Sequence, residues 1–200
     1  MRNKRISTTV MVRAALLGTI ACVLMQLSLS LPIFPGFLEL DVSDVPALIA
    51  VITTGPLTGL LVSLIKNLLD PIIFGTSTGG LGNFANFVIG TALVVPIGLI
   101  YQRRKNISSY LLGSVVGIVT MVVVASLTNY FILLPLYSLM FMPIENIILM
   151  ANSVNSLVTD IPTLILFTIV PFNLLKGIVT VLLGYMLYTV LKPVLRHIAI

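Results

Sequence analysis

The sequence predicts an all-α integral membrane protein with six transmembrane helices. Hydrophobic side chains make up 58% of the 200 residues and charged ones 8%, whereas about a quarter of a soluble domain is charged. The mean hydropathy is +1.16, and the apolar runs are long and continuous, which favours helices over the alternating segments of a membrane barrel. We therefore expect residues 1–200 to form a single membrane domain in contact with the lipid bilayer.

Basic residues set the expected topology. They gather in the N-terminal tail, at residues 103–105, and near the C-terminus at Lys192 and Arg196. Because positive charge is retained on the cytoplasmic side, both termini and the 103–105 turn are expected there. The net charge of +5 then reflects topology rather than nucleic-acid binding.

The first span is expected over residues 8–31, without a signal-peptide cleavage site. Along it Ala14, Gly18 and Cys22 form a stripe of small side chains, which suits either packing within the chain or docking of a partner subunit. With one cysteine, no disulfide is expected. Residues 32–43 are too rich in proline and glycine for a helix, and they form either a lid over the helices or a segment in the lipid interface.

The stretch from Asp44 to Asp70 is interrupted at Gly55-Pro56. One long span here would place residues 103–105 outside, whereas two short spans, 44–54 and 56–70, keep them inside. Ser43 and Asp44 are expected to cap the first of these helices. Asp41 and Asp44 could also be a metal pair, but no third ligand lies nearby, so no metal site is predicted.

The remaining spans are expected over residues 83–101, 109–136 and 172–191. Residues 142–160 are polar enough for an extracellular loop with a short interfacial helix. Pro171 leaves two alternatives, because the last span either begins near Phe172 or contains a kink there.

Polar side chains concentrate in the outer half of this topology: Asn83, Asn86, Asn129, Asn173 and Lys176. A lysine at the centre of a span costs about 2.5 to 3.5 kcal/mol, and less where it can reach the interface. The shared location favours one polar cavity over independent contacts. Neutral carboxamides, which both donate and accept hydrogen bonds, suit a neutral ligand with polar edges.

The sequence lacks the residues that several function classes require. The chain has no phosphate-binding loop, no chain of acids for proton coupling, and no catalytic serine, histidine and acid set. An enzyme is therefore not predicted, and an intramembrane enzyme and a structural scaffold are the rival interpretations. The chain is expected to bind a ligand from outside and to need partners to move it.

Five blocks in order resemble the substrate-binding (S) components of energy-coupling factor (ECF) transporters, in particular riboflavin-binding members. The blocks are 38–46, 59–70, 83–87, 129–137 and 171–177. The resemblance implies a six-helix S-component fold with an extracellular lid after the first helix, in a bacterial cell membrane. It implies riboflavin as transported ligand, no cofactor, and a module of one transmembrane coupling subunit and two ATPases as partners. The alternative is another vitamin or flavin mononucleotide (FMN).

The resemblance also implies residue roles. Asn129, Asn173 and Lys176 match positions that hydrogen-bond the vitamin, and Glu39 to Asp41 match the lid. The stripe of Ala14, Gly18 and Cys22 matches the surface that docks on the coupling subunit. The full expected binding set is Glu39, Leu40, Asp41, Asn83, Phe84, Asn86, Asn129, Asn173 and Lys176.

Overall fold

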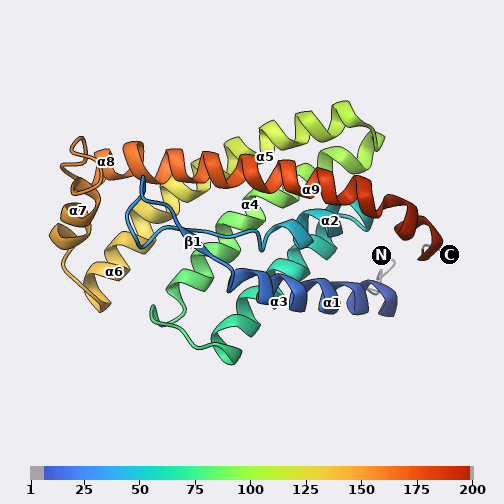
Figure 1. The fold of residues 1–200 in the computed structure, drawn as a ribbon, viewed down its shortest axis with the longest axis horizontal. Coiled ribbons are helices and arrows are strands. Elements are labelled where there is room, and N and C mark those ends of the chain that lie inside the picture. The colour runs from blue at the N-terminus through green and yellow to red at the C-terminus, as the bar shows by residue number, and fades with distance from the viewer. Residues whose placement is uncertain (1–6, 199–200) are drawn as a thin grey trace, which may run out of the picture.

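A computed structural model describes residues 7–198, with side chains up to Pro193, and the N-terminal tail and the Arg196 side chain lie outside this part. The backbone is mostly helical, with one short hairpin (Figure 1). The elements are α1 (Thr8–Met25), β1 (Leu29–Ser30), β2 (Glu39–Leu40), α2 (Val45–Thr53), α3 (Pro56–Ile73), α4 (Leu81–Arg104), α5 (Ile107–Thr128), η1 (Asn129–Leu133), α6 (Leu134–Met140), α7 (Ile144–Asn152), α8 (Ile161–Leu164), η2 (Ile165–Ile169) and α9 (Val170–Ile198).

Within the described residues, five helical runs are long and apolar enough to cross a membrane. They are Thr8–Met25, Pro56–Ile73, Leu81–Arg104, Ile107–Met140 and Ile161–Pro193. The expected count of six transmembrane helices is not confirmed, because α2 has only nine residues. The chain returns from the end of α1 as extended backbone and then as α2, so this passage is only partly helical (Figure 1).

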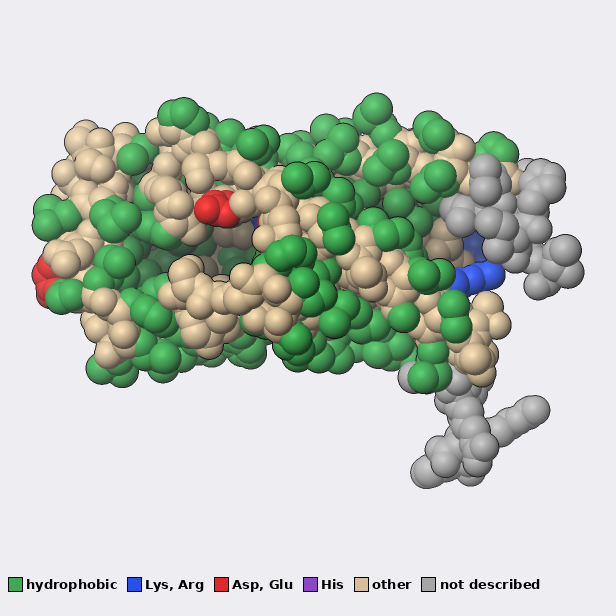
Figure 2. Space-filling view, turned by 60° about the horizontal axis from the view of Figure 1, so that its bottom comes forward, with side chains coloured by type: hydrophobic (Ala, Val, Ile, Leu, Met, Phe, Trp, Pro, Cys, Tyr) green, Lys and Arg blue, Asp and Glu red, His purple; other side chains and the backbone are tan. Residues whose placement is uncertain are grey.

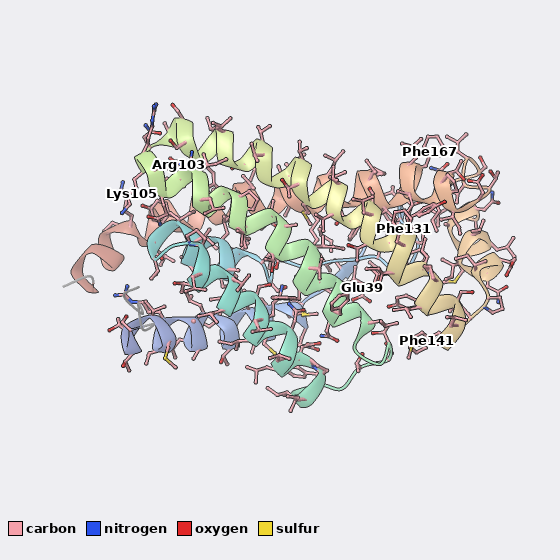
Figure 3. The ribbon with its side chains drawn as sticks, turned by 180° about the vertical axis from the view of Figure 1, so that it is seen from behind. Glu39, Arg103, Lys105, Phe131, Phe141 and Phe167 are labelled. Atoms are coloured by element: carbon pink, nitrogen blue, oxygen red, sulfur yellow. The ribbon has the colours of Figure 1, made fainter. Side chains whose placement is uncertain are left out.

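The start of α1, the turn between α4 and α5, and the end of α9 lie at the same end of the molecule (Figure 1). We call this the basic end, because Arg103, Arg104 and Lys105 lie there, as Figure 3 shows for Arg103 and Lys105. The helices α6, α7 and α8 lie at the opposite end. An even number of passages therefore separates the two ends of the chain.

Helix α2 ends at Thr53 and α3 begins at Pro56, so residues 44–70 form two segments rather than one long span. Gly55 joins them with φ of 121°, a conformation that glycine adopts without strain, and Pro56 fits the first turn of α3. The last carbonyls of α2 lack partners in their own helix. Gln102 of α4 supplies the missing donor, since its Nε2 donates to the Val51 and Ile52 oxygens at 2.9 and 3.0 Å.

The final helical run begins at Ile161 and continues through Pro171, so of the two alternatives the start near Phe172 is wrong. Asp160 starts it with a capping box, in which its side chain accepts from the Thr163 amide. Pro171 does not interrupt the helix, because the π-helical turn η2 directly precedes it. The turn η1 likewise precedes Pro135, so in both places a widened turn accommodates a proline that lacks an N–H.

The small-residue stripe of α1 faces the interior. Ala14 and Cys22 are each 1% exposed, and Gly18 packs so closely that a Cβ there would lie 2.6 Å from Ile65 of α3. Small side chains let two helix backbones approach in this way. The structure thus uses the stripe for packing within the chain and leaves it no exposed surface for docking.

The main apolar core fills the basic end. It combines buried residues of α1, α2, α3 and α4 with Tyr110, Met121 and Val181 of α5 and α9. The hydroxyl of Tyr110 donates to the Val181 carbonyl at 2.7 Å, so its polar end is satisfied. The opposite half of the molecule contains a cavity.

Candidate functional site

A cavity of about 700 Å³ opens between the connecting segment, residues 26–44, and helices α3, α4, α5 and α9. Figure 2 shows this face hollowed, with acidic side-chain atoms at the rim, and Glu39 is the exposed acid among the lining residues. Figure 3 shows Glu39 amid the helices, far from Arg103 and Lys105 at the basic end. The volume is in the range of small-molecule sites, about 300 to 1,000 Å³.

The connecting segment is folded back onto the helices. Leu29 pairs with Leu40 and Ser30 with Glu39 in a short antiparallel hairpin, and the Ser28 hydroxyl donates to the Glu39 carboxylate. At the tip of the segment Phe34 is buried and meets Phe172 of α9 edge to face, with ring centroids 5.3 Å apart. Phe34 thereby anchors the segment on α9, whereas Leu29, Ile33 and Glu39 remain exposed.

Lys176 is 7% exposed and forms an ion pair across the cavity with Asp41, its Nζ donating to Oδ2 at 2.7 Å. Asp41 also accepts hydrogen bonds from the backbone amide and the hydroxyl of Ser43. The Lys176 ammonium and the amide and hydroxyl of Ser43 together stabilise the ionised Asp41 carboxylate in this buried position. Lys176 therefore fastens α9 to the connecting segment and does not snorkel to an interface.

Lys66 of α3 is fully buried and was not predicted as a site residue. Its Nζ donates to Asp44 Oδ1 at 2.6 Å, to Ser43 Oγ at 2.8 Å and to Asn86 Oδ1 at 3.2 Å. The predicted capping role of Asp44 is wrong, because its side chain makes no capping bond to α2 and instead pairs with Lys66. Asp44 pairs with Lys66 rather than capping α2, because leaving a buried ammonium unpaired would cost far more free energy than losing a capping bond.

Asp70 near the end of α3 was also missed, although it lines the cavity. Its Oδ1 accepts from Gln26 Nε2 at 2.5 Å and its Oδ2 from Asn83 Nδ2 at 2.7 Å. One carboxylate thereby joins the outer ends of α1, α3 and α4. The sequence signal for Asp70 and Lys66 was their ionisable character inside an apolar run.

Asn129 is the first residue of the π-helical turn η1, and Asn173 lies in α9, four residues after η2 ends at Ile169. Each amide donates back along its own helix at 2.8 Å, to the oxygens of Ala125 and Ile169 respectively. Among the described residues, the Oδ1 atoms of the two asparagines accept no hydrogen bond from protein, and both residues line the cavity. Two acceptors therefore remain for a ligand.

The structure brings seven of the nine predicted binding residues to the cavity: Glu39, Asp41, Asn83, Asn86, Asn129, Asn173 and Lys176. Leu40 and Phe84 do not line it. Successive side chains of an extended strand point to opposite sides, so Leu40 faces away when its two neighbours face the cavity. Phe84, next to Asn83 on a helix, points outward and is 47% exposed.

Four carboxylates and the Lys176 ammonium line the cavity, together with carboxamides and apolar side chains such as Ile89 and Phe172, and Lys66 lies behind this lining, paired with Asp44. No group of three metal-ligating acid, histidine or cysteine side chains occurs in the described part of the chain. The arrangement suits an uncharged ligand with an apolar body and several hydrogen-bonding groups.

Comparison with known proteins gives one consistent family. The sequence profile of the ECF transporter substrate-specific component matches residues 9–188. The riboflavin transporter RibU of Staphylococcus aureus is 36% identical over 198 residues, covering 98% of this chain and 95% of its own length. The riboflavin transporter FmnP of Bacillus subtilis is 33% identical, covering 92% of each chain.

A solved structure, described as that of the S component of a bacterial ECF transporter, aligns with a TM-score of 0.72 at 32% identity. The alignment covers 94% of this chain and 97% of the solved one. These relatives are transporters and transporter components, not enzymes. With the buried charge network and the cavity in a bundle of membrane helices, they establish that the chain belongs to the substrate-specific (S) components of ECF transporters.

Proposed function

We propose that this S component captures riboflavin in the cavity and carries it into the cell when docked on an energy-coupling module. The observation that supports this most strongly is the cavity of about 700 Å³, lined by amide oxygens and a partly free ammonium. The relatives named riboflavin transporters, at 33% and 36% identity over nearly the whole chain, point to the same ligand.

The chemistry of riboflavin fits these groups. Its flat tricyclic ring can pack against apolar side chains of the cavity such as Ile89, Met121 and Phe172. Its ring edge and ribityl hydroxyls supply donors for the free oxygens of Asn129 and Asn173. Lys176 uses one of its three N–H groups on Asp41, so two remain for ligand acceptors.

The charge of the cavity favours riboflavin over FMN. Lys66 spends its three donors on protein acceptors, and Glu39, Asp41, Asp44 and Asp70 outnumber the two lysines. A phosphate group would bring up to two further negative charges into this site. We therefore propose the unphosphorylated vitamin, with FMN or another vitamin as the alternative ligand.

Transport requires energy from partners, since no nucleotide-binding loop occurs in the sequence. We propose the partners of the family resemblance, one transmembrane coupling subunit and two ATPases. We also propose that the basic end faces the cytoplasm and that the cavity opens outward. The buried Ala14, Gly18 and Cys22 stripe is not part of the proposed docking surface.

The test is a titration of riboflavin with the detergent-purified protein, in which quenching of flavin fluorescence reports binding. FMN is measured in parallel. We expect saturation at one riboflavin per chain and at least tenfold weaker binding of FMN. An S component for another vitamin would leave riboflavin fluorescence unchanged, and equal affinities for both flavins would contradict the charge reasoning.

A further inference from the structure

Asn83 and Asn86 form a polar wall on α4, because residues three apart share a helix face and both line the cavity. A carboxamide can present either its oxygen or its nitrogen to a ligand. The side that it presents is decided by what holds its other end. The two asparagines are held by residues of opposite hydrogen-bonding character, Asp70 and Lys66.

Asp70 holds Asn83. An ionised carboxylate only accepts hydrogen bonds, and its two oxygens receive Asn83 Nδ2 at 2.7 Å and Gln26 Nε2 at 2.5 Å. With its nitrogen committed to Asp70, Asn83 keeps its Oδ1 for the cavity. Asn83 is 7% exposed and Asp70 also 7%, so water competes little for these bonds.

Lys66 holds Asn86 in the reverse sense. An ammonium only donates, and Lys66 Nζ lies 3.2 Å from Asn86 Oδ1. The other end of this amide, Nδ2, contacts the Met25 sulfur at 3.9 Å, which is a weak acceptor. Asn86 therefore keeps a donor for the cavity, beside the acceptor of Asn83.

We propose that Asp70 and Lys66 are positioning residues that fix the wall on α4 as an acceptor next to a donor. This pair recognises a ligand edge on which an N–H stands beside a C=O. The inference rests on the proposed function, because the imide of riboflavin has such an edge: its N–H would donate to Asn83 and a neighbouring carbonyl would accept from Asn86. Neither Asp70 nor Lys66 needs to touch the ligand.

The test compares riboflavin with 3-methylriboflavin, in which a methyl group replaces the imide hydrogen, by fluorescence titration of purified protein. The wild type should bind the methylated ligand at least tenfold more weakly. The variant Asp70→Leu keeps a similar volume but has no acceptor, so the amides of Asn83 and Gln26 lose the group that holds them. We expect riboflavin to bind about tenfold more weakly and the methylated ligand to change less than about threefold.

Rescue separates orientation from simple support of the helix ends. Asp70→Asn keeps an acceptor for Asn83, because the Gln26 amide can turn so that its oxygen accepts from the new NH₂ group. Discrimination between the two ligands should therefore persist in Asp70→Asn and be lost in Asp70→Leu. A purely structural role predicts instead that Asp70→Leu weakens both ligands equally, and that result would overturn the proposal.

Asn83→Ala tests the same step without touching Asp70, so the proposal stays testable if Asp70→Leu does not fold. It should also abolish discrimination, and unchanged discrimination would refute the role of Asn83. The matched control is Asp160→Asn, at the start of α8 and outside the cavity, which should leave both affinities unchanged. A wild type that binds neither flavin would contradict the proposed function itself, whereas a wild type that binds both equally would contradict only this inference.

Discussion

Replacing Lys176 by methionine removes the charge that pairs with Asp41 and keeps most of the side-chain volume. At 2.7 Å the attraction between the two charges is about 6 kcal/mol for an effective dielectric constant near 20. Removing one partner of a buried pair costs about 3 to 5 kcal/mol, because the other charge stays buried. Asp41 keeps its bonds from Ser43, so we expect about 3 kcal/mol, near the lower end.

The same substitution removes the two remaining N–H donors that we assign to riboflavin. A hydrogen bond to a charged group contributes about 1.5 to 3 kcal/mol, which corresponds to roughly a 10- to 150-fold change in Kd. The assay is fluorescence titration of riboflavin on purified Lys176→Met, with thermal unfolding measured on the same preparation. Both the Kd and the unfolding temperature should be affected.

Adding Asp41→Asn to Lys176→Met distinguishes the two effects. The double variant buries no unpaired charge, so the unfolding temperature should recover most of its loss. The affinity should not recover, because the donors of Lys176 are still missing. If affinity recovers together with stability, Lys176 acts only by holding the connecting segment, and its assignment as a ligand contact is refuted.

Two further predictions concern single features of the cavity. Asn129→Ala should weaken riboflavin binding at least tenfold by removing a free acceptor, whereas Ser126→Ala, one turn away and outside the cavity, should leave titrations unchanged. Gly90→Ala should lower the free energy of unfolding by about 1 to 3 kcal/mol, because its Cβ would lie 2.6 Å from the Asp44 oxygen that Lys66 holds in place. Gly36→Ala is the control, since a Cβ there would have nothing within 4 Å. Equal unfolding temperatures for the two variants would contradict this prediction.

Local signals in the sequence were sufficient to predict several features of the structure. The basic residues at 103–105 indicate a turn at the same end as the termini, and the structure places them there. The Gly55-Pro56 pair indicates a turn because its backbone requirements are local. Asparagines with Lys176 in the outer half of the chain pointed to one cavity, and the structure brings them together.

Other features depended on tertiary contacts. The return passage through residues 39–44 and the nine-residue α2 is possible because surrounding helices bury it, and no local pattern states that. Pro171 predicts a start or a kink of the last span, whereas the preceding π-helical turn lets the helix continue through it. The small-residue stripe on α1 suits a partner or a neighbouring helix equally well, and only the packing of Gly18 on Ile65 decides between them.

The charge network was partly foreseeable. Lys66 lies inside an apolar run, as Lys176 does, so the same cost of a buried ammonium indicates that it needs a partner. Its partners could not be identified from the sequence, since Asp44 and Asn86 lie 22 and 20 residues away on other elements. The orientation of each amide in the cavity follows from these long-range contacts.

The most direct test of the central claim is an absorption spectrum of the protein purified in detergent after incubation with riboflavin and removal of the excess. The wild type should retain a flavin band near one equivalent, and Lys176→Met should retain far less while remaining monodisperse. A folded wild type that stays colourless and does not quench riboflavin fluorescence would contradict the account. The cavity would then have to be assigned to another ligand.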